Sequence, residues 1–467
     1  MKVEATITAG MPAFEVIGLP ELAVREARVR VRSAIRMAGL DFPRTRVVVE
    51  VTDPFASTAN DLPIALAVLK TPLPADCIVM GELSLQGDIR PCVDVMRQVQ
   101  GAPMCIVPWD NYWEARAVCD HVYAARSLRS AVDCLAGLAL WPEPPTLPAP
   151  PTYPPPLCMS DVRGHSVAKR AMEVAAVGGH HVALVGSPGC GKIMLGRRLP
   201  TIMAPMTKEE AIETSMIHSE AGLLPLRGGL LTERPFRAPH HTCSSSALIG
   251  GGTIPRPGEV SLAHNGVLCL DEFHEFPRMV TESLREPLEQ GTATVTRARV
   301  ERKFHAKGQA VLLMNACPCG SAYSATKECK CSEQTLERFW RRLNGKVVDS
   351  VEIWVGPMAN PNVDPSQLRY AAQGDTSATI QARVVAARAN LARLVAAGMP
   401  VEDAAVVPWA EHVAKLGLTD TAVAQALAVA ASIAALDNYG KGFDVIKIHH
   451  LAEALQYRRP DFTIVNS

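Results

Sequence analysis

The sequence lacks long apolar runs and an excess of charge of either sign. No uncharged apolar stretch reaches about 18 residues, the length that a membrane-spanning helix requires, so we expect no membrane partner. Lys and Arg together number 47, as do Asp and Glu, so any contact with a polyanion must come from a local basic patch. The residues after Met1 contain no apolar signal segment, so we expect no secretion signal.

The 13 cysteines are an odd number scattered along 467 residues. Without a secretion signal, this pattern favours reduced thiols and a cytoplasmic location over a disulfide framework. The length predicts several domains, and 48% hydrophobic residues supply their cores.

A proline-rich segment divides the chain. Nine prolines lie among the 16 residues from Trp141 to Pro156, a composition that excludes a helix or a central strand. We therefore predict an extended linker over residues 138–158.

Residues 1–137 are predicted to form a small α/β domain. Pro20 and Gly39 bracket a helical pattern, and β-branched or apolar runs predict strands. The predicted strands cover 14–17, 47–51, 77–80, 83–85 and 104–107, with 77–80 and 83–85 expected to pair.

Residues 159–363 carry the motifs, and residues 364–467 are rich in alanine with helical spacing. The last segment predicts a helical bundle, with helices near 380–398, 418–436 and 448–457.

A glycine-rich loop follows the apolar run 181–185 and precedes a helical pattern, which is the context of a phosphate-binding loop. Backbone N–H groups of such a loop surround a phosphate, and its lysine reaches the terminal phosphates. The loop consists of Gly186, Ser187, Pro188, Gly189, Cys190, Gly191 and Lys192.

The next position departs from the phosphate-loop pattern. A Ser or Thr hydroxyl coordinates Mg²⁺ there in other proteins, but this chain has Ile193, which offers no oxygen. We expect nucleotide binding with one protein ligand to the metal missing.

Polar residues directly follow two further apolar runs. Asp271 and Glu272 follow 267–270, and Asn315 follows 311–314. We interpret Asp271 as the residue that holds Mg²⁺, Glu272 as the one that polarises the attacking water, and Asn315 as the one that orients it.

Two Cys-x-Cys pairs follow Asn315. Cys317, Cys319, Cys329 and Cys331 provide four thiols for a structural Zn²⁺. Their spacing is tighter than the usual Cys-x₂-Cys, and unpaired reduced cysteines in a loop are the alternative.

Two basic segments have open interpretations. Arg338, Arg341 and Arg342 flank Phe339 and Trp340 in a cluster that could contact nucleic acid, or in a helix with buried aromatics and solvated arginines. His240 and His241, beside Arg237, fit either a DNA-facing or ring-lining loop or a structural turn.

Several segments together resemble the competence protein ComM family, whose AAA+ core is similar to the ATPase subunit of magnesium chelatase. The resemblance is collinear over nearly the whole chain. It rests on residues 10–14, 18–20, 61–66, 234–241, 257–264, 284–289, 317–320 and 451–458 together with the phosphate loop.

The resemblance implies an α/β fold class with three parts. These are an N-terminal domain like the ribosomal S5/Lon-protease fold, a P-loop AAA+ core and a C-terminal helical lid. It also implies ATP and Mg²⁺ as cofactors and a homo-hexameric ring that acts on branched or single-stranded DNA, as a helicase or branch-migration motor in transformation and recombination.

The chain also departs from that family. Relatives begin further upstream, so we expect the first strand of the N-terminal domain to be missing. Ser350 replaces the arginine expected to act in trans, and Thr421, Gln425 and Ala431 stand where the lid would carry arginines. Since an arginine finger contributes about a thousandfold or more to turnover, we expect impaired hydrolysis.

Two other functions remain open from the sequence. Ile193 and Ser350 fit a nucleotide-binding structural or regulatory paralogue that does not hydrolyse ATP. The resemblance to magnesium chelatase allows a metal-chelatase motor subunit.

Overall fold

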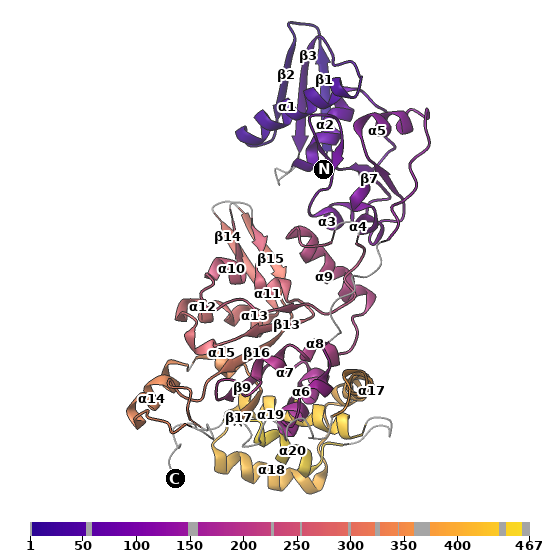
Figure 1. Ribbon diagram of the computed structural model, residues 1–467. Helices are drawn as coiled ribbons and strands as arrows, with labels where there is room; N and C mark the ends of the chain where they lie inside the picture. Colours follow the sequence, from indigo (N-terminus) through magenta and orange to yellow (C-terminus); the bar gives the residue numbers. More distant parts are fainter. Residues whose placement is uncertain are drawn as a thin grey trace. The chain divides into compact units, whose positions relative to one another are not determined.

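A computed structural model describes residues 2–52, 58–147, 157–225, 228–252, 255–297, 300–322, 327–343, 345–358, 374–438 and 445–459. The chain forms two compact units (Figure 1). The first comprises Met1–Thr152 and Thr207–Thr232, and the second comprises Tyr153–Met206 and Glu233–Ser467. Residues 148–156 of the predicted linker and 359–373, which include the predicted start of the lid, lie outside the described residues. Residues 141–147 contain no helix or strand.

The first unit begins with a small sheet in the strand order β1-β3-β2. Strand β1 runs antiparallel to β3, and β2 runs parallel to it. Alternate residues of β3 are buried against α1 and α2, which explains the β-branched run. The elements are β1 (Lys2–Thr8), β2 (Ala13–Ile17), α1 (Glu21–Met37), β3 (Arg46–Thr52), a 3₁₀ turn η1 (Thr58–Asn60) and α2 (Asp61–Val68).

The rest of this unit corrects one expectation from the sequence. Strand β4 (Cys77–Val79) does not pair with β5 (Glu82–Leu83), because β4 joins the parallel sheet β4-β7-β8 while β5 forms a hairpin with β6 (Ile89–Arg90). Gly87, at φ +92°, lies in the turn of that hairpin. The other elements are α3 (Val95–Val99), β7 (Met104–Pro108), η2 (Trp109–Asn111), α4 (Tyr112–Arg116), β8 (Val122–Ala125) and α5 (Leu128–Leu135).

A distant segment completes the first unit. Helix α9 (Lys208–Glu220) packs against α3, and the backbone N–H of Asp94 donates to the carbonyl of Ser219. Glu114 accepts hydrogen bonds from Ser219 Oγ and, over 2.6 Å, from Asn111 Nδ2. The predicted boundaries at 137, 158 and 363 gave no indication that residues 207–232 belong to this unit.

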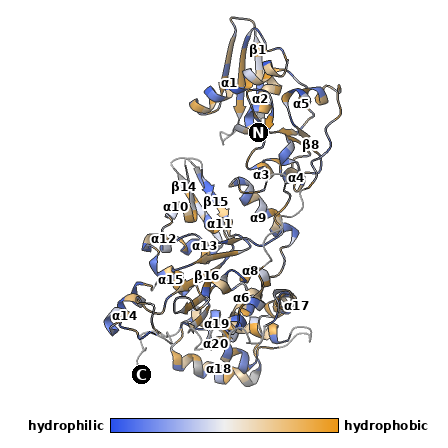
Figure 2. Cartoon of the chain, viewed as in Figure 1, coloured by the Kyte–Doolittle hydropathy of each residue, from blue (hydrophilic) through white to orange (hydrophobic). Residues whose placement is uncertain are grey.

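A parallel sheet organises the second unit, in the strand order β10-β13-β16-β9-β17. Both faces are covered: Val182 and Leu184 of β9 belong to one core cluster, while Ala183 and Val185 belong to another. Burial on both faces accounts for the continuous apolar runs of these strands, and Figure 2 shows hydrophobic colouring on the strands around β16. The strands are β9 (Val182–Gly186), β10 (Phe236–Arg237), β13 (Val267–Leu270), β16 (Gln309–Met314) and β17 (Ile353–Met358).

Short elements connect these strands. A hairpin of β14 (Thr292–Arg297) and β15 (Val300–His305) and a minimal ladder of β11 (Gly250–Gly251) and β12 (Arg256–Pro257) are both antiparallel. The helices are η3 (Met159–Asp161), α6 (Ser166–Gly178), α7 (Lys192–Gly196), α8 (Leu199–Ile202), α10 (Ser245–Ile249), α11 (Glu259–Leu262), η4 (Phe273–Glu275), α12 (Arg278–Ser283), α13 (Arg285–Gln290), α14 (Glu333–Arg342) and α15 (Lys346–Asp349).

C-terminal helices cover one face of the sheet together with α6. They are α17 (Ser377–Ala396), α18 (Asp403–Leu416), α19 (Asp420–Asp437) and α20 (Ile448–Gln456). By length and composition alone, α19 could cross a membrane, but half of that window is buried and the helix packs against α17, α20 and α6. The apolar residues of α19 are therefore accounted for by the core of this unit.

Candidate functional site

The predicted phosphate loop lies at the carboxyl edge of the parallel sheet. Gly186 ends β9, and the loop that follows turns into α7 through Gly189 at φ +76° and Gly191 at φ +96°. L-amino acids with a side chain rarely adopt such positive φ angles, so these glycines permit a turn that other residues would strain. A Cβ at Gly186 would lie 2.4 Å from the carbonyl oxygen of Met358 in β17, so this position also requires glycine.

The Lys192 side chain folds back over the loop. Its Nζ donates to the carbonyl oxygens of Gly186 and Ser187 over 2.9 and 3.0 Å and to Asn315 Oδ1 over 3.4 Å. Burial lowers the pKa of this amine, while the nearby Asp271 and Glu272 raise it. The structure thus places Lys192 beside Asn315 and within electrostatic reach of the acidic pair.

Strand register explains why these residues meet. Val185 of β9 is aligned with Met314 of β16, and Leu270 of β13 is aligned with Leu312. Parallel strands end at the same edge of a sheet, where ligands of open α/β sheets bind. The residues that follow these strands consequently share one site.

Glu272 has an unusual backbone conformation and a specific partner. Its φ is +52°, a left-handed conformation that residues other than glycine rarely adopt and that often occurs at functional sites. Its carboxylate Oε2 lies 3.3 Å from His241 Nδ1, and Asp271 Oδ1 accepts a hydrogen bond from its backbone N–H. Both acidic side chains are exposed rather than paired in a core.

His274 is a site residue that the sequence analysis missed. It is buried, its Nε2 accepts from Asn315 Nδ2 over 3.5 Å, and its ring contacts Phe339 of α14 at 5.6 Å between centroids. Burial lowers its pKa, which favours the neutral ring. Its position three residues after Asp271 was the available signal, and it makes Asn315 a bridge between Lys192 and His274.

His165 is a second missed residue. Its φ is +52°, and its imidazole forms a hydrogen bond with the backbone of Cys190, while burial lowers its pKa. His165 Nε2 lies 3.8 Å from the position that a Cβ on Gly191 would take. The imidazole therefore borders the phosphate loop, and no spacing in the sequence pointed to it.

The residues present fit a nucleotide phosphate. Ser187 Oγ is buried and has no hydrogen-bond partner among the described residues, so a polar group remains available inside the loop. Mg²⁺ fits less completely, because Ile193 packs its half-buried side chain against the core and leaves Asp271 as the acidic candidate ligand.

The other departures lie at defined places. Ser350 follows α15 and donates to the carbonyl of Lys346 over 2.9 Å, while Gln425 donates to the carbonyl of Asp349. Thr421 is exposed on α19, whereas Ala431 is fully buried in the core. An arginine at position 431 would need different packing.

For the two basic segments with open interpretations, the structure favours a structural role for some of the residues. Trp340 is 4% exposed and packs in the core, so it cannot stack on a base, while Arg338, Arg341 and Arg342 are exposed. His240 closes a turn by a hydrogen bond with Thr242 Oγ1.

The neighbouring arginine of the second segment is also engaged. Arg237 Nε and Nη2 donate to the two carboxylate oxygens of Glu259 over 2.6 and 2.7 Å. A guanidinium paired in this bidentate way is a structural contact, so this segment presents no free arginine side chain to DNA.

A basic helix face was not identified from the sequence. Arg25, Arg28, Arg32 and Arg36 recur along α1 at helical spacing and, with Phe14, Val29 and Met37, line a groove of about 570 Å³. Hydrophilic and hydrophobic stretches alternate on this helix (Figure 2). The arginine spacing was the signal that could have identified this patch.

Comparison with known proteins identifies the family. Residues 158–363 match the model for magnesium chelatase, subunit ChlI, and residues 3–105 match the model for subunit ChlI of Mg-chelatase. The uncharacterized protein YifB of Salmonella typhimurium is 34% identical over 99% of this chain and 95% of its own. Competence protein ComM of Haemophilus influenzae is 34% identical over 98% of this chain and 94% of its own.

The chain belongs to the ComM/YifB-type family. A more distant relative is the DNA replication licensing factor MCM6 of Oryza sativa, which is 25% identical over 36% of this chain and 19% of its own length. Membership confirms the family predicted from the motifs and fits the parallel sheet with its AAA+-type phosphate loop.

Proposed function

We propose that this protein is an ATP-binding AAA+ protein of the ComM type, which assembles into a homo-hexameric ring and acts on branched or single-stranded DNA in the cytoplasm. In this proposal the first unit contains an S5/Lon-like domain, and the C-terminal helices form the lid of the ATPase core. None of the 13 cysteines is joined in a disulfide, which is compatible with the cytoplasmic location.

One observation carries the nucleotide part of the proposal. Lys192, Asn315 and His274 form a continuous polar chain at the carboxyl edge of the sheet, directly beside the glycine loop. A phosphate seated in this loop would compete with the carbonyls of Gly186 and Ser187 for the Lys192 ammonium, which is its natural charged partner.

The residues take distinct roles in this site. Mg²⁺, when bound with the nucleotide, would neutralise phosphate charge, and Asp271 is the acidic residue placed to hold it. Glu272 would accept a proton from the attacking water, and His241 at 3.3 Å would hold that carboxylate in place. Asn315 would orient the water while His274 fixes the amide rotamer.

The DNA part of the proposal rests on local charge. Among the relatives, the DNA replication licensing factor MCM6 is named for a role in DNA replication, and the α1 groove supplies an exposed arginine row on a chain with no net charge. Each phosphate contact contributes about 0.9 to the slope of log affinity against log salt.

Charge reversal tests the DNA surface. The triple change Arg28→Glu, Arg32→Glu and Arg36→Glu should reduce that slope by about three if each arginine contacts a phosphate. A matched triple change, Arg338→Glu, Arg341→Glu and Arg342→Glu on α14, reverses the same number of exposed charges and serves as the control. DNA affinity that falls only in the control would contradict the assignment of α1.

A second candidate function follows from Ile193. Without a hydroxyl at this position, and with Ser350 in place of a finger arginine, the chain would bind ATP as a structural or regulatory subunit without turning it over. If ATP turnover is stimulated by a chelatase partner and not by DNA, the protein is instead a metal-chelatase motor subunit.

The deciding experiment measures ATP binding and Mg²⁺-dependent turnover with and without branched DNA. Lys192→Ala is the control, because it removes the ammonium that would pair with the phosphates, together with its hydrogen bonds to the loop carbonyls. DNA-stimulated turnover that disappears in Lys192→Ala supports a motor. Binding with turnover no higher than in the control supports the second function, and a lack of ATP binding refutes both.

A further inference from the structure

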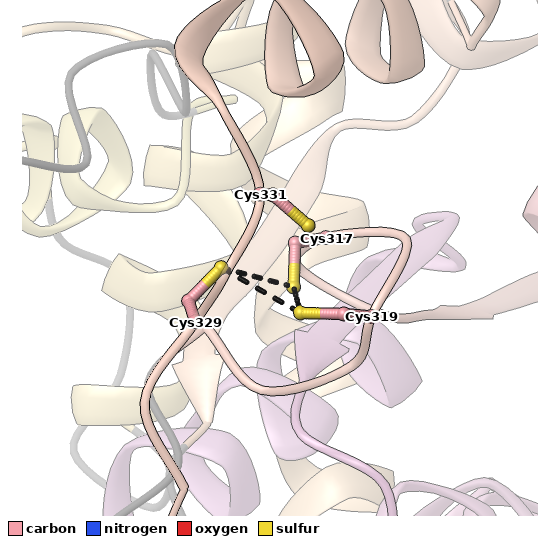
Figure 3. A group of neighbouring side chains, drawn as sticks. All are labelled: Cys317, Cys319, Cys329 and Cys331. Atoms are coloured by element: carbon pink, nitrogen blue, oxygen red, sulfur yellow. Dashed lines mark hydrogen bonds between the residues drawn. The ribbon is translucent and has the colours of Figure 1, made fainter.

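Four cysteine thiols converge beside the phosphate loop. Cys317 and Cys319 follow β16, and Cys329 and Cys331 precede α14, so two separate segments contribute (Figure 3). The four sulfur atoms all lie within 4.8 Å of one another. Figure 3 shows the side chains pointing towards a common centre.

Three of the sulfur separations are close to those of a tetrahedral metal site. They are 3.3 Å between Cys317 and Cys319, 3.6 Å between Cys319 and Cys329, and 3.7 Å between Cys329 and Cys317, and the sulfur of Cys331 lies within 4.8 Å of the others. A zinc–sulfur distance of about 2.3 Å gives tetrahedral edges of about 3.8 Å. A disulfide would require about 2.05 Å, and all four cysteines are free.

The surroundings of the thiols also suit thiolate ligands. The buried Cys317 accepts a hydrogen bond to its sulfur from the backbone N–H of Ala322 over 3.2 Å. Such a bond orients a ligand and offsets its negative charge. Lys327, Glu328 and Lys330 flank Cys329 in the sequence, so this stretch brings one net positive charge to a segment whose zinc-bound thiolate group would carry two net negative charges.

We propose that Cys317, Cys319, Cys329 and Cys331 bind one Zn²⁺ as a closed structural site. Four sulfur ligands leave no open position for a substrate, which separates this site from a catalytic zinc centre. Each thiol loses its proton on binding, so zinc affinity falls as the pH falls.

The site is placed to support the nucleotide site, a part of the inference that rests on the proposed function. Asn315 lies two residues before Cys317. Gly320, at φ +73°, packs closely against Pro188 of the phosphate loop, since a Cβ added to this glycine would lie 2.8 Å from the proline ring. On the other side, α14 carries Phe339 against His274. Zinc would therefore fix both segments that hold the Asn315–His274 pair.

The first test measures metal content and ligand type in the full chain. We expect about one zinc per chain by mass spectrometry after purification under reducing conditions, and cobalt substitution should give the intense visible absorption of tetrahedral thiolate coordination. Protein that takes up neither metal, or that contains a disulfide between these cysteines under the same conditions, overturns the proposal.

Variants locate the site. Cys319→Ser and Cys331→Ser change the more accessible ligands and should lower zinc occupancy severalfold, whereas Cys77→Ser, in β4 of the first unit, should retain it. Circular dichroism checks that each variant folds. Equal zinc content in all three variants overturns the assignment, and the cobalt spectrum of the unsubstituted chain remains decisive if the variants do not fold.

Nucleotide binding then tests the coupling. Zinc-depleted Cys319→Ser should bind ATP more weakly than Cys77→Ser, while Lys192→Ala should lose ATP binding and keep its zinc. Retained zinc in Lys192→Ala separates failure of the metal site from failure of the proposed function. Unchanged ATP affinity in a zinc-free, folded Cys319→Ser would refute the coupling.

Discussion

Replacing Ile193 by threonine should restore the hydroxyl that the phosphate-loop pattern provides for Mg²⁺. Ile193 is the second residue of α7, its side chain is half-buried, and it packs against the core beneath the loop. Threonine keeps the β-branched shape at χ1 and adds one oxygen. The change therefore tests metal coordination with little alteration of the backbone.

Ile193→Val is the matched control for this change. It removes one methylene, which costs about 0.8 kcal/mol when fully buried and about half of that at a half-buried position. Threonine and valine have nearly the same size, but a buried hydroxyl costs free energy, so the unfolding temperature of each variant is measured and turnover is compared where both are folded. Their difference in activity then reports the hydroxyl.

A hydrogen bond to a charged group stabilises the state in which it forms by about 1.5–3 kcal/mol. Lowering the free energy of activation by about 1.4 kcal/mol raises a rate about tenfold. We therefore expect Mg²⁺-dependent ATP turnover of Ile193→Thr to exceed that of Ile193→Val by about tenfold, with half-saturation at lower Mg²⁺. Steady-state phosphate release at varied Mg²⁺ measures both.

The result that refutes this reasoning is equal turnover and equal Mg²⁺ dependence in the two variants. Such equality would mean that the metal is held without a ligand at this position. Turnover of Ile193→Thr should still remain low in absolute terms, because Ser350 leaves the charge of the transferring phosphoryl group without the finger arginine.

Two further predictions concern packing and protonation. Gly320→Ala should weaken ATP binding by several-fold, because the added methyl group would lie 2.8 Å from Pro188 of the phosphate loop. Gly398→Ala is the control, because Gly398 shares the positive φ but has nothing within 4 Å of the added methyl group, so this change should affect only stability. Equal ATP affinity in the two variants would contradict a role for the contact with Pro188. His180 is buried, and burial lowers its pKa from 6.5 to about 4. Its imidazole is therefore neutral in both the folded and the unfolded protein above pH 6.5. As the pH falls from 6.5 towards 4, the imidazole gains a proton only in the unfolded protein. The free energy of unfolding should then drop by about 3 kcal/mol over this range and level off below it, and urea unfolding of His180→Gln should show a shallower pH dependence; the same slope in both proteins would exclude His180 as its source.

Much of the sheet could be predicted from the sequence because its signals are local. Strands β9, β13 and β16 consist of apolar runs, apart from Gln309 at the start of β16, and glycine, aspartate or asparagine stands at or directly after their ends. Burial on both faces of a parallel sheet requires such runs. The positions of Lys192 and Asn315 followed from the same runs. Their direct contact did not, because it depends on the register between β9 and β16.

Other features depended on pairing between distant segments. Strand β1 alternates polar and apolar residues along its whole length, but its place in the sheet is set by antiparallel pairing with the distant β3. Strands β4 and β5 are adjacent in sequence, yet each has a different partner. Helix α9 joins the first unit through contacts with α3 that no local pattern reveals.

The contacts of the acidic pair also bear on how the site works. Glu272 is exposed and its carboxylate contacts His241, so it is accessible to water and is not buried in an ion pair. His241 is 27% exposed at its side chain and reaches Glu272 from the segment between β10 and α10. For that segment, the sequence was compatible with either a DNA-facing or ring-lining loop or a structural turn. Because its second histidine contacts the glutamate, a ligand that moves this segment would change the position of the carboxylate. The same residues could thus be a structural turn and a route by which DNA binding alters ATP turnover. A larger fall in DNA-stimulated turnover than in basal turnover in His241→Ala would distinguish this coupling from a purely structural role, for which both rates fall by the same factor.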